Sequence, residues 1–431
     1  MTGLLILLLW LAATIQYRVE LGLFSFALME PVALLVVGFL FLYQLGRGRL
    51  VLTKDRLQWL FLAFTIWVAI IRPWAEGWKH GLSDVRDWAI PVLTYVVLIG
   101  TVRKGWRRWS RLFVLLAVLY TFLGLYQVAT DSFRITGGTA LFKSSFSVTP
   151  EGKLALASYA AGFFNHPNNF ADYLSWALMI CLGLSTSQPR WRFLAPLGAI
   201  LLMIGIFLTY SKSAVAGAAI SIVVLIALRL KGGKPLVLVT GLCAMLVPAA
   251  ALIFLALLPQ GGFTSHPILS TFFWRVGVWR DTLQIIQSHP EILLIGNGDG
   301  MLAALYPFVF FHPHNLFLYF LLDYGIVGLV FIIAVGWTIV NRGVMLYQRH
   351  LARREPLLLA LWMALLNTFI LGLAEAAFIC IELRMIFLIV AACFTGLSRE
   401  IRAEQSLTTV EPEIRRLGKY GQAQVARPVH L

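Results

Sequence analysis

One short run in this 431-residue sequence carries the residues best suited to proton transfer near neutral pH: His312-Pro313-His314-Asn315, directly before the apolar stretch Leu316–Ala334. Proline favours a first helical turn, so His314 is expected at or near a helix N-terminus. The positive end of the helix disfavours the imidazolium, which keeps His314 neutral and able to accept a proton. We therefore take His314 as the candidate general base, with His312 and Asn315 as substrate contacts. The alternative is an interfacial histidine that only caps a helix.

Three cations could attract an anionic substrate. Lys212, in the turn Ser211-Lys212-Ser213, is expected beside the N-terminus of the span that follows, where free backbone N–H groups favour anions. Arg275 and Arg280 lie in a long segment between spans, and the planar guanidinium is suited to phosphate oxygens. The alternatives are a lysine that snorkels to the headgroups and arginines that contact lipid phosphates.

The other ionisable residues suggest less. Asp84 and Asp87 flank Arg86 and fit a solvated loop better than a metal site. Four more acids lie within or at the ends of apolar spans but are scattered: Asp172, Asp323, Glu375 and Glu382. The four cysteines lie in apolar spans without a CxxC pair, and no HExxH, GxSxG or phosphate-loop motif is present, so we expect neither a metal nor a cofactor.

The elements that position these residues are membrane helices. Hydrophobic residues make up 59% of the chain and charged residues 13%, with a mean hydropathy of +0.82. Because a bilayer crossing takes about 20 apolar residues, we expect an all-α polytopic membrane protein with about 12 transmembrane helices and short outer-face helices. The expected spans are 3–16, 24–45, 57–72, 89–102, 112–128, 169–184, 193–210, 213–229, 235–258, 315–338, 357–376 and 380–396; the first is interpreted as a retained helix because Met1-Thr2-Gly3 lacks the basic start of a signal peptide.

Lysine and arginine set the orientation. With a cytoplasmic N-terminus, the inner loops and the tail hold 24 of the 35 basic residues and six of the 20 acidic ones, a net charge of +18. The formal charge of +15 is thus explained by the positive-inside rule, without a nucleic-acid partner. Both termini are then cytoplasmic, and the candidate site faces outward.

The chain divides into a transmembrane domain, 1–396, and a cytoplasmic tail, 397–431, whose mixed polar composition favours disorder. Two outer segments, 129–168 and 259–314, are too long for simple turns. In the second, Val276, Trp279, Leu283 and Ile286 follow helical spacing, so Trp274–Ser288 is expected to form an amphipathic helix at the outer surface.

The stretch from Arg275 to Leu329 resembles the signature of the O-antigen ligase and polymerase family. Its elements are Arg275 and Trp279, His289-Pro290, the turn Gly296–Gly300, His314-Asn315, and Asp323 before Gly325 and Gly328. The segments GFFNHPNNFADYL (Gly162–Leu174, with Asn168) and LTYSKSAVAG (Leu208–Gly217) also agree, so the resemblance covers roughly residues 160–335.

The resemblance implies a GT-C-like glycosyltransferase of the bacterial inner membrane that needs no metal or nucleotide. It transfers a glycan from an undecaprenyl-pyrophosphate carrier to an acceptor hydroxyl on the periplasmic face. Arg275 would hold the pyrophosphate, His314 would serve as the base, and Asn168 would contact substrate. Lys212 stands where the family often has arginine, a change that keeps the charge but loses the bidentate geometry.

Within this family the acceptor distinguishes two activities. A polymerase joins lipid-linked repeat units of an O-antigen or exopolysaccharide, whereas a ligase moves the finished polysaccharide onto lipid A–core. The lysine at position 212 and the compact outer loop favour the polymerase. A flippase or transporter for a lipid-linked sugar is the alternative from another class, but spans 193–210 and 235–258 are almost wholly apolar.

Overall fold

The computed structural model describes 18–21, 24–27, 29–46, 55–76, 78–101, 105–130, 145–148, 154–157, 160–162, 164, 166–187, 191–230, 267–296, 312–375, 378 and 380–425, with isolated residues elsewhere and without the side chains from 405 onward. The expected spans 3–16 and 235–258 lie outside these residues.

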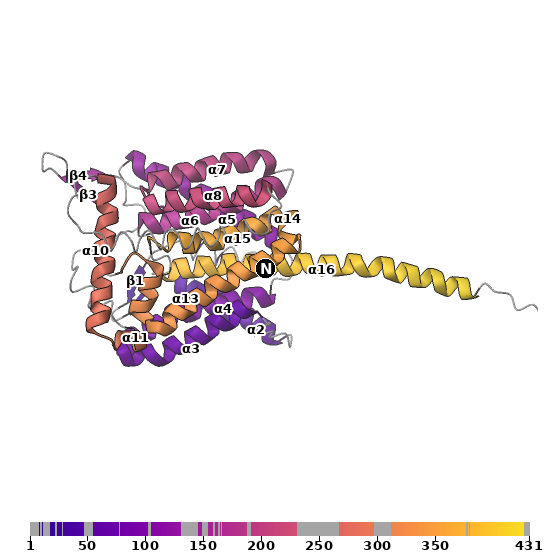
Figure 1. Ribbon diagram of the computed structural model, residues 1–431, viewed down its shortest axis with the longest axis horizontal. Helices are drawn as coiled ribbons and strands as arrows, with labels where there is room; N and C mark the ends of the chain where they lie inside the picture. Colours follow the sequence, from indigo (N-terminus) through magenta and orange to yellow (C-terminus); the bar gives the residue numbers. More distant parts are fainter. Residues whose placement is uncertain are drawn as a thin grey trace, which may run out of the picture.

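The described chain is helical except for two short hairpins, which confirms the all-α fold class. The long helices are α2 (Met29–Gly46), α3 (Arg56–Glu76), α4 (Trp78–Thr101), α5 (Trp106–Thr130), α6 (Pro167–Ser187), α7 (Trp191–Leu208), α8 (Lys212–Leu230), α10 (Pro267–Ser288), α13 (Leu316–Gln348), α15 (Pro356–Leu371) and α16 (Ile381–Val425). Two single-turn helices, α11 (Ile292–Ile295) and α14 (Leu351–Arg354), connect them. Most long helices run side by side, whereas α10 lies across one end of the bundle (Figure 1).

Five of the described helices are long and apolar enough to cross a membrane: Arg56–Ala75, Trp106–Ala129, Lys212–Arg229, Leu316–Gln348 and Ile381–Glu404. Across the bundle, the helices expose large apolar side chains, among them Leu35, Leu119, Phe193 and Trp337, each more than half exposed. In a soluble protein such surfaces would be costly, but in lipid they are the expected contact surface.

The membrane part of α16 occupies the centre of the bundle, since its most apolar stretch is wholly buried. Glycine lets a neighbouring helix approach closely there: a Cβ added to Gly396 would lie 2.0 Å from the Trp106 ring. Beyond the membrane part, α16 continues to Val425. The helix therefore runs through most of the segment 397–431 that we expected to be disordered.

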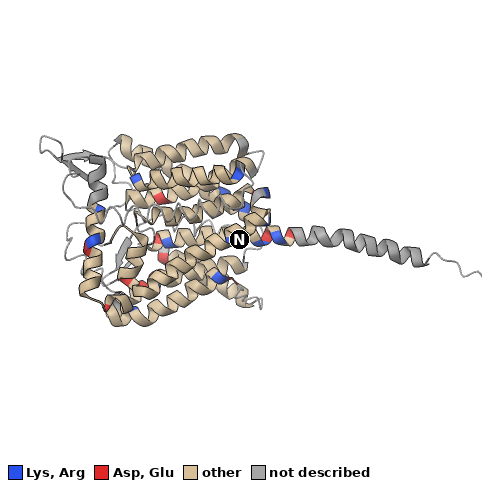
Figure 2. Cartoon of the chain, viewed as in Figure 1, with Lys and Arg blue, Asp and Glu red and all other residues tan. Residues whose placement is uncertain are grey.

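Ion pairs join the loops that we assigned to the inner face. Asp55, before α3, binds Arg342 of α13 at 2.8 Å and Arg399 of α16 at 3.4 Å. Arg107 of α5 binds Glu355, before α15, at 2.7 Å. Charged residues accordingly gather toward the two ends of the bundle (Figure 2). The segments that we assigned to the inner face therefore contact one another at the same end of the bundle, as they must if they all lie on one side of the membrane.

A break in α13 explains two glycines of the sequence signature. Gly325 has φ 66° and ψ −162° inside the helix, where Arg72 of α3 donates a hydrogen bond of 2.7 Å to the carbonyl of Asp323. The end of α11 packs against this break. A Cβ on Gly296, which has φ 77°, would lie 2.0 Å from the Asp323 carbonyl oxygen. Only glycine permits this approach of two backbones.

The outer segments contain more structure than simple loops. Helix α10 begins at Pro267 and ends at Ser288, so it includes the expected amphipathic helix Trp274–Ser288. Two short antiparallel hairpins were not predicted: β1 (Arg18–Leu21) pairs with β2 (Phe24–Ala27), and β3 (Ser145–Val148) pairs with β4 (Leu154–Ala157). The runs are only four residues long, too short for a pattern of alternation to reveal them.

Candidate active site

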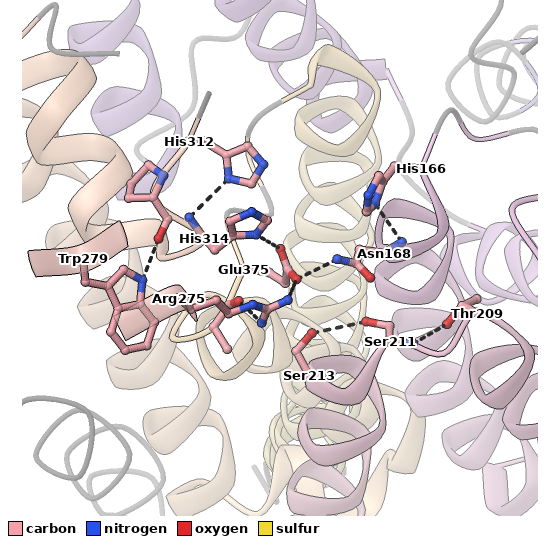
Figure 3. Close-up of polar contacts among 12 residues, drawn as sticks. His166, Asn168, Thr209, Ser211, Ser213, Arg275, Trp279, His312, His314 and Glu375 are labelled. Carbon is pink, nitrogen blue, oxygen red and sulfur yellow. Dashed lines mark hydrogen bonds and ion pairs between the residues drawn. The ribbon is translucent and has the colours of Figure 1, made fainter. Parts of the chain in front are cut away.

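Glu375 lies at the centre of a buried polar cluster, which we define as His166, Asn168, Arg275, His312, His314 and Glu375 (Figure 3). The expected span 357–376 is too long at its end, because α15 ends at Leu371 and the chain turns at Gly372. The Gly372 carbonyl accepts a hydrogen bond of 2.6 Å from the backbone N–H of Leu316, which ties this turn to the start of α13. The Glu375 side chain, 6% exposed, therefore points toward the residues that precede α13.

Helix α10 presents two residues of the Arg-x-x-x-Trp pattern to this cluster. Arg275 forms an ion pair with Glu375 Oε1 through Nη2, and its Nη1 donates a hydrogen bond of 2.5 Å to the Ala374 carbonyl. Four residues later, on the same helix face, Trp279 Nε1 donates to the Pro313 carbonyl at 2.6 Å. The spacing of the pattern thus lets one helix hold both the turn with Glu375 and the turn before α13.

The position of His314 is set by its neighbour Asn315, which joins the start of α13 to the turn after α15. The Asn315 side chain accepts hydrogen bonds from the N–H groups of Phe317 and Leu318 at 3.0 and 3.1 Å, so Asn315 is the N-cap of α13. Its own amide donates to the Leu373 carbonyl at 3.0 Å. His314, with φ 46°, adopts the left-handed conformation that turns its ring toward Glu375. Asn315 is thus placed by the structure as a helix cap.

Two turns of the same sequence pattern, His-Pro-X-Asn, meet at Glu375. In each turn the first histidine accepts, through Nδ1, the backbone N–H of the residue two positions on: His166 from Asn168 at 3.1 Å and His312 from His314 at 3.3 Å. The residue at this third position, Asn168 or His314, also contacts Glu375 through its side chain. Asn168 Nδ2 donates to Oε1 at 2.6 Å, and His314 Nδ1 lies 3.0 Å from Oε2.

The electrostatics assign the protons in this cluster. Burial alone would raise the pKa of Glu375, but the Arg275 guanidinium and the His314 hydrogen bond outweigh it and lower that pKa to about 2. Burial lowers the pKa of His166 to about 4 and holds the pKa of His312 well below its usual value. Glu375 is therefore ionised at neutral pH, and His166 and His312 are neutral.

An ionised carboxylate only accepts hydrogen bonds, so His314 Nδ1 carries the proton that it donates to Glu375. In that tautomer Nε2 carries no proton and is a hydrogen-bond acceptor. Nε2 is buried and has no hydrogen-bond partner among the described residues, while Trp274 packs against the ring with its centroid 5.2 Å away. This is the arrangement of a general base that is oriented by a carboxylate. The described residues include no group of three or more His, Cys, Asp or Glu that could hold a metal ion.

The predicted site residues fall into two groups. Arg275, His312, His314 and Asn168 are brought together around Glu375, whereas the Asn315 side chain caps α13 and binds the Leu373 carbonyl. Lys212 and Arg280 lie outside the cluster as we defined it. Lys212 is the exposed first residue of α8, after the buried Ser211, and Arg280 is half-buried on α10. Arg280 is five positions after Arg275 on α10, so the two side chains leave the helix in directions roughly 140° apart around its axis.

Other features of the sequence are placed differently from our expectation. Asp84 and Asp87 do not lie in a solvated loop but on α4, where Asp84 binds Arg72 at 2.6 Å and Asp87 binds Arg86 at 2.9 Å. Glu375 itself was one of four scattered acids in the sequence. The only feature of the sequence that pointed to Glu375 was an acid at the outer end of a span. The residues that contact it lie 60 to more than 200 positions away in the chain.

The fold and the site define an integral membrane protein with a buried polar site among the loops at one end of its helical bundle. Residues 197–333 match the family model described as O-Antigen ligase, which confirms the family resemblance over this segment of the chain. The match includes Lys212, Arg275 and His314 but neither Asn168 nor Glu375. It supports a glycosyltransferase activity of the ligase or polymerase type. No curated protein matches the chain.

Proposed function

We propose that this protein transfers a glycan from an undecaprenyl-pyrophosphate carrier to an acceptor hydroxyl at the periplasmic face of the bacterial inner membrane. The observation that carries the proposal is the shared contact of Arg275 and His314 with Glu375. It puts a cation and an oriented base within reach of one substrate, in a region where the positive-inside rule makes cations scarce.

In the proposed reaction, His314 Nε2 takes the proton of the acceptor hydroxyl while the acceptor oxygen attacks the anomeric carbon. The bond from that carbon to the diphosphate oxygen breaks, and the diphosphate leaves with its negative charge. Glu375 stabilises the imidazolium that forms, because it remains ionised beside Nδ1. No metal or cofactor is needed for this proton transfer.

Fixed cations stabilise the charge that builds on the leaving diphosphate. Arg275 is the nearest candidate: Nη1 and Nη2 are engaged by the turn that carries Glu375, while its buried Nε has no partner among the described residues. Lys212, exposed at the N-terminus of α8, is the second candidate cation. Membrane lipids around the bundle hold the polyprenyl tail.

We favour polymerisation of O-antigen or exopolysaccharide repeat units over transfer to lipid A–core, because Lys212 replaces an arginine that the family often has. Deletion of the gene followed by gel analysis of the cell's glycans separates the two. Single repeats without a ladder support polymerisation, whereas full-length chains left on the lipid carrier contradict it in favour of a ligase.

Purified protein in liposomes tests the reaction class. With lipid-linked donor and acceptor on the site-bearing face, we expect consumption of the donor and a longer glycan product. A flippase would only change the leaflet in which the donor resides.

A further inference from the structure

A buried acid lies beneath the cluster and is not used by the proposed reaction. Asp172 is on α6, one helical turn beyond Asn168, so the two side chains share a helix face. The residue is 2% exposed, and its carboxyl forms no hydrogen bond with the described residues. The nearby Ser175 does not serve it, because the serine hydroxyl donates to the Asp172 backbone carbonyl and accepts from Asn367.

Asp172 lies one turn from Asn168, whose amide reaches Glu375 in the turn after α15, and Glu375 in turn binds Arg275 of α10, so the charges of both groups act on the Asp172 carboxyl. One guanidinium therefore serves two neighbouring acids. Glu375 receives the ion pair with Arg275, the Asn168 amide and the His314 ring, whereas none of the described residues donates a hydrogen bond to the Asp172 carboxyl. Two carboxylates in one low-dielectric region do not both ionise readily, and the one without donors keeps its proton.

We propose that Asp172 is protonated in the resting protein and that its neutral state keeps Glu375 ionised, which orients His314. This inference rests on the proposed function for its catalytic meaning. An ionised Asp172 would repel the Glu375 carboxylate and favour a proton on it. A protonated Glu375 is a poorer partner for His314 Nδ1–H, so the base would lose its orientation. Asp172 is thus a positioning residue that acts through Glu375.

Infrared spectroscopy of the purified protein in lipid tests the protonation directly and needs no transfer activity. We expect the spectrum of the wild type at neutral pH to contain a protonated-carboxyl band that Asp172→Asn lacks. Ser175→Ala, which alters the same helix face without touching a carboxyl, should keep the band. If Asp172→Asn does not fold, Asp172→Glu serves instead and should shift the band. A wild-type spectrum that neither substitution changes overturns the proposal.

The activity measurement tests the positioning role. Because asparagine resembles the neutral acid, Asp172→Asn should retain transfer within about threefold of the wild type at neutral pH. A folded Asp172→Asn that loses as much activity as Glu375→Gln shows that a carboxylate is needed at position 172 and overturns the proposal. If Glu375→Gln itself is fully active, the proposed function fails, while the infrared result still decides the state of Asp172.

Discussion

Asn168 and His314 occupy equivalent positions in two His-Pro-X-Asn turns, and each forms a hydrogen bond with a different oxygen of the same carboxylate. The two turns precede α6 and α13, helices that begin at the same end of the bundle. In each turn the histidine before the proline holds the backbone through its Nδ1. Pro167 is the first residue of α6, whereas Pro313 lies two residues before Asn315, the N-cap of α13. The site is therefore built where two helix starts converge on the turn between α15 and α16.

Glu375→Gln should reduce the rate of transfer about 100-fold, with a smaller change in KM, because a neutral amide cannot stabilise the imidazolium at His314. The measurement is steady-state transfer by purified protein in lipid. Glu291→Gln is the matched control: Glu291 is an exposed acid that likewise contacts a histidine, His289, and its substitution should leave the rate unchanged.

His314→Ala removes the proposed base and should lower kcat by about 10²–10⁴-fold. His289→Ala serves as the control and should leave kcat unchanged. His289 also stands next to a proline of the signature, Pro290, but its side chain is 46% exposed at the turn between α10 and α11. A His314→Ala protein that folds and transfers glycan at the wild-type rate contradicts the assignment of the base.

Acid should weaken the fold through Glu375. Its pKa is about 2 in the folded protein against an ordinary 4.5, so ionisation of Glu375 stabilises the folded state above pH 4.5, and this contribution is lost as the pH falls toward 2. The shift corresponds to on the order of 3 kcal/mol. Thermal unfolding in lipid at neutral and acidic pH should therefore show a smaller acid-induced loss for Glu375→Gln than for the wild type. An equal loss in both proteins would contradict the lowered pKa.

Gly296→Ala should destabilise the packing of α11 on the break in α13, since the added Cβ would meet the Asp323 carbonyl oxygen at 2.0 Å. We expect a loss of about 2 kcal/mol or more, measured as a lower unfolding temperature. Gly277→Ala, inside α10 with nothing within 4 Å of the added Cβ, should instead be neutral or stabilising. If both substitutions behave alike, the close approach at Gly296 is not the cause.

Much of this architecture could be predicted because lipid imposes long apolar runs and because proline and asparagine mark helix starts. The expected span 213–229 matches α8, and the signature placed Arg275 and His314 at one site. The end of α15 was predicted five residues too late, since the helix ends at Leu371 while the apolar run continues.

Tertiary contacts decided what the sequence left open. Glu375 resembled Asp172, Asp323 and Glu382 in its local sequence, and only the convergence of three distant segments distinguishes it. The polar local sequence of Asp84 and Asp87 predicts a solvated loop, whereas the two residues lie on α4 and bind the arginines Arg72 and Arg86. A pairing of charges across helices has no periodic signature in the chain.

The central claim is that His314 and Glu375 act as one unit in glycan transfer, and a double-mutant cycle tests it most directly. Transfer from a lipid-pyrophosphate-linked donor is measured in liposomes for the wild type, His314→Ala, Glu375→Gln and the double variant, each confirmed as folded. We predict that the double variant is no slower than His314→Ala alone, because Glu375 acts through the histidine. Losses that multiply, or full transfer without His314, would contradict the account.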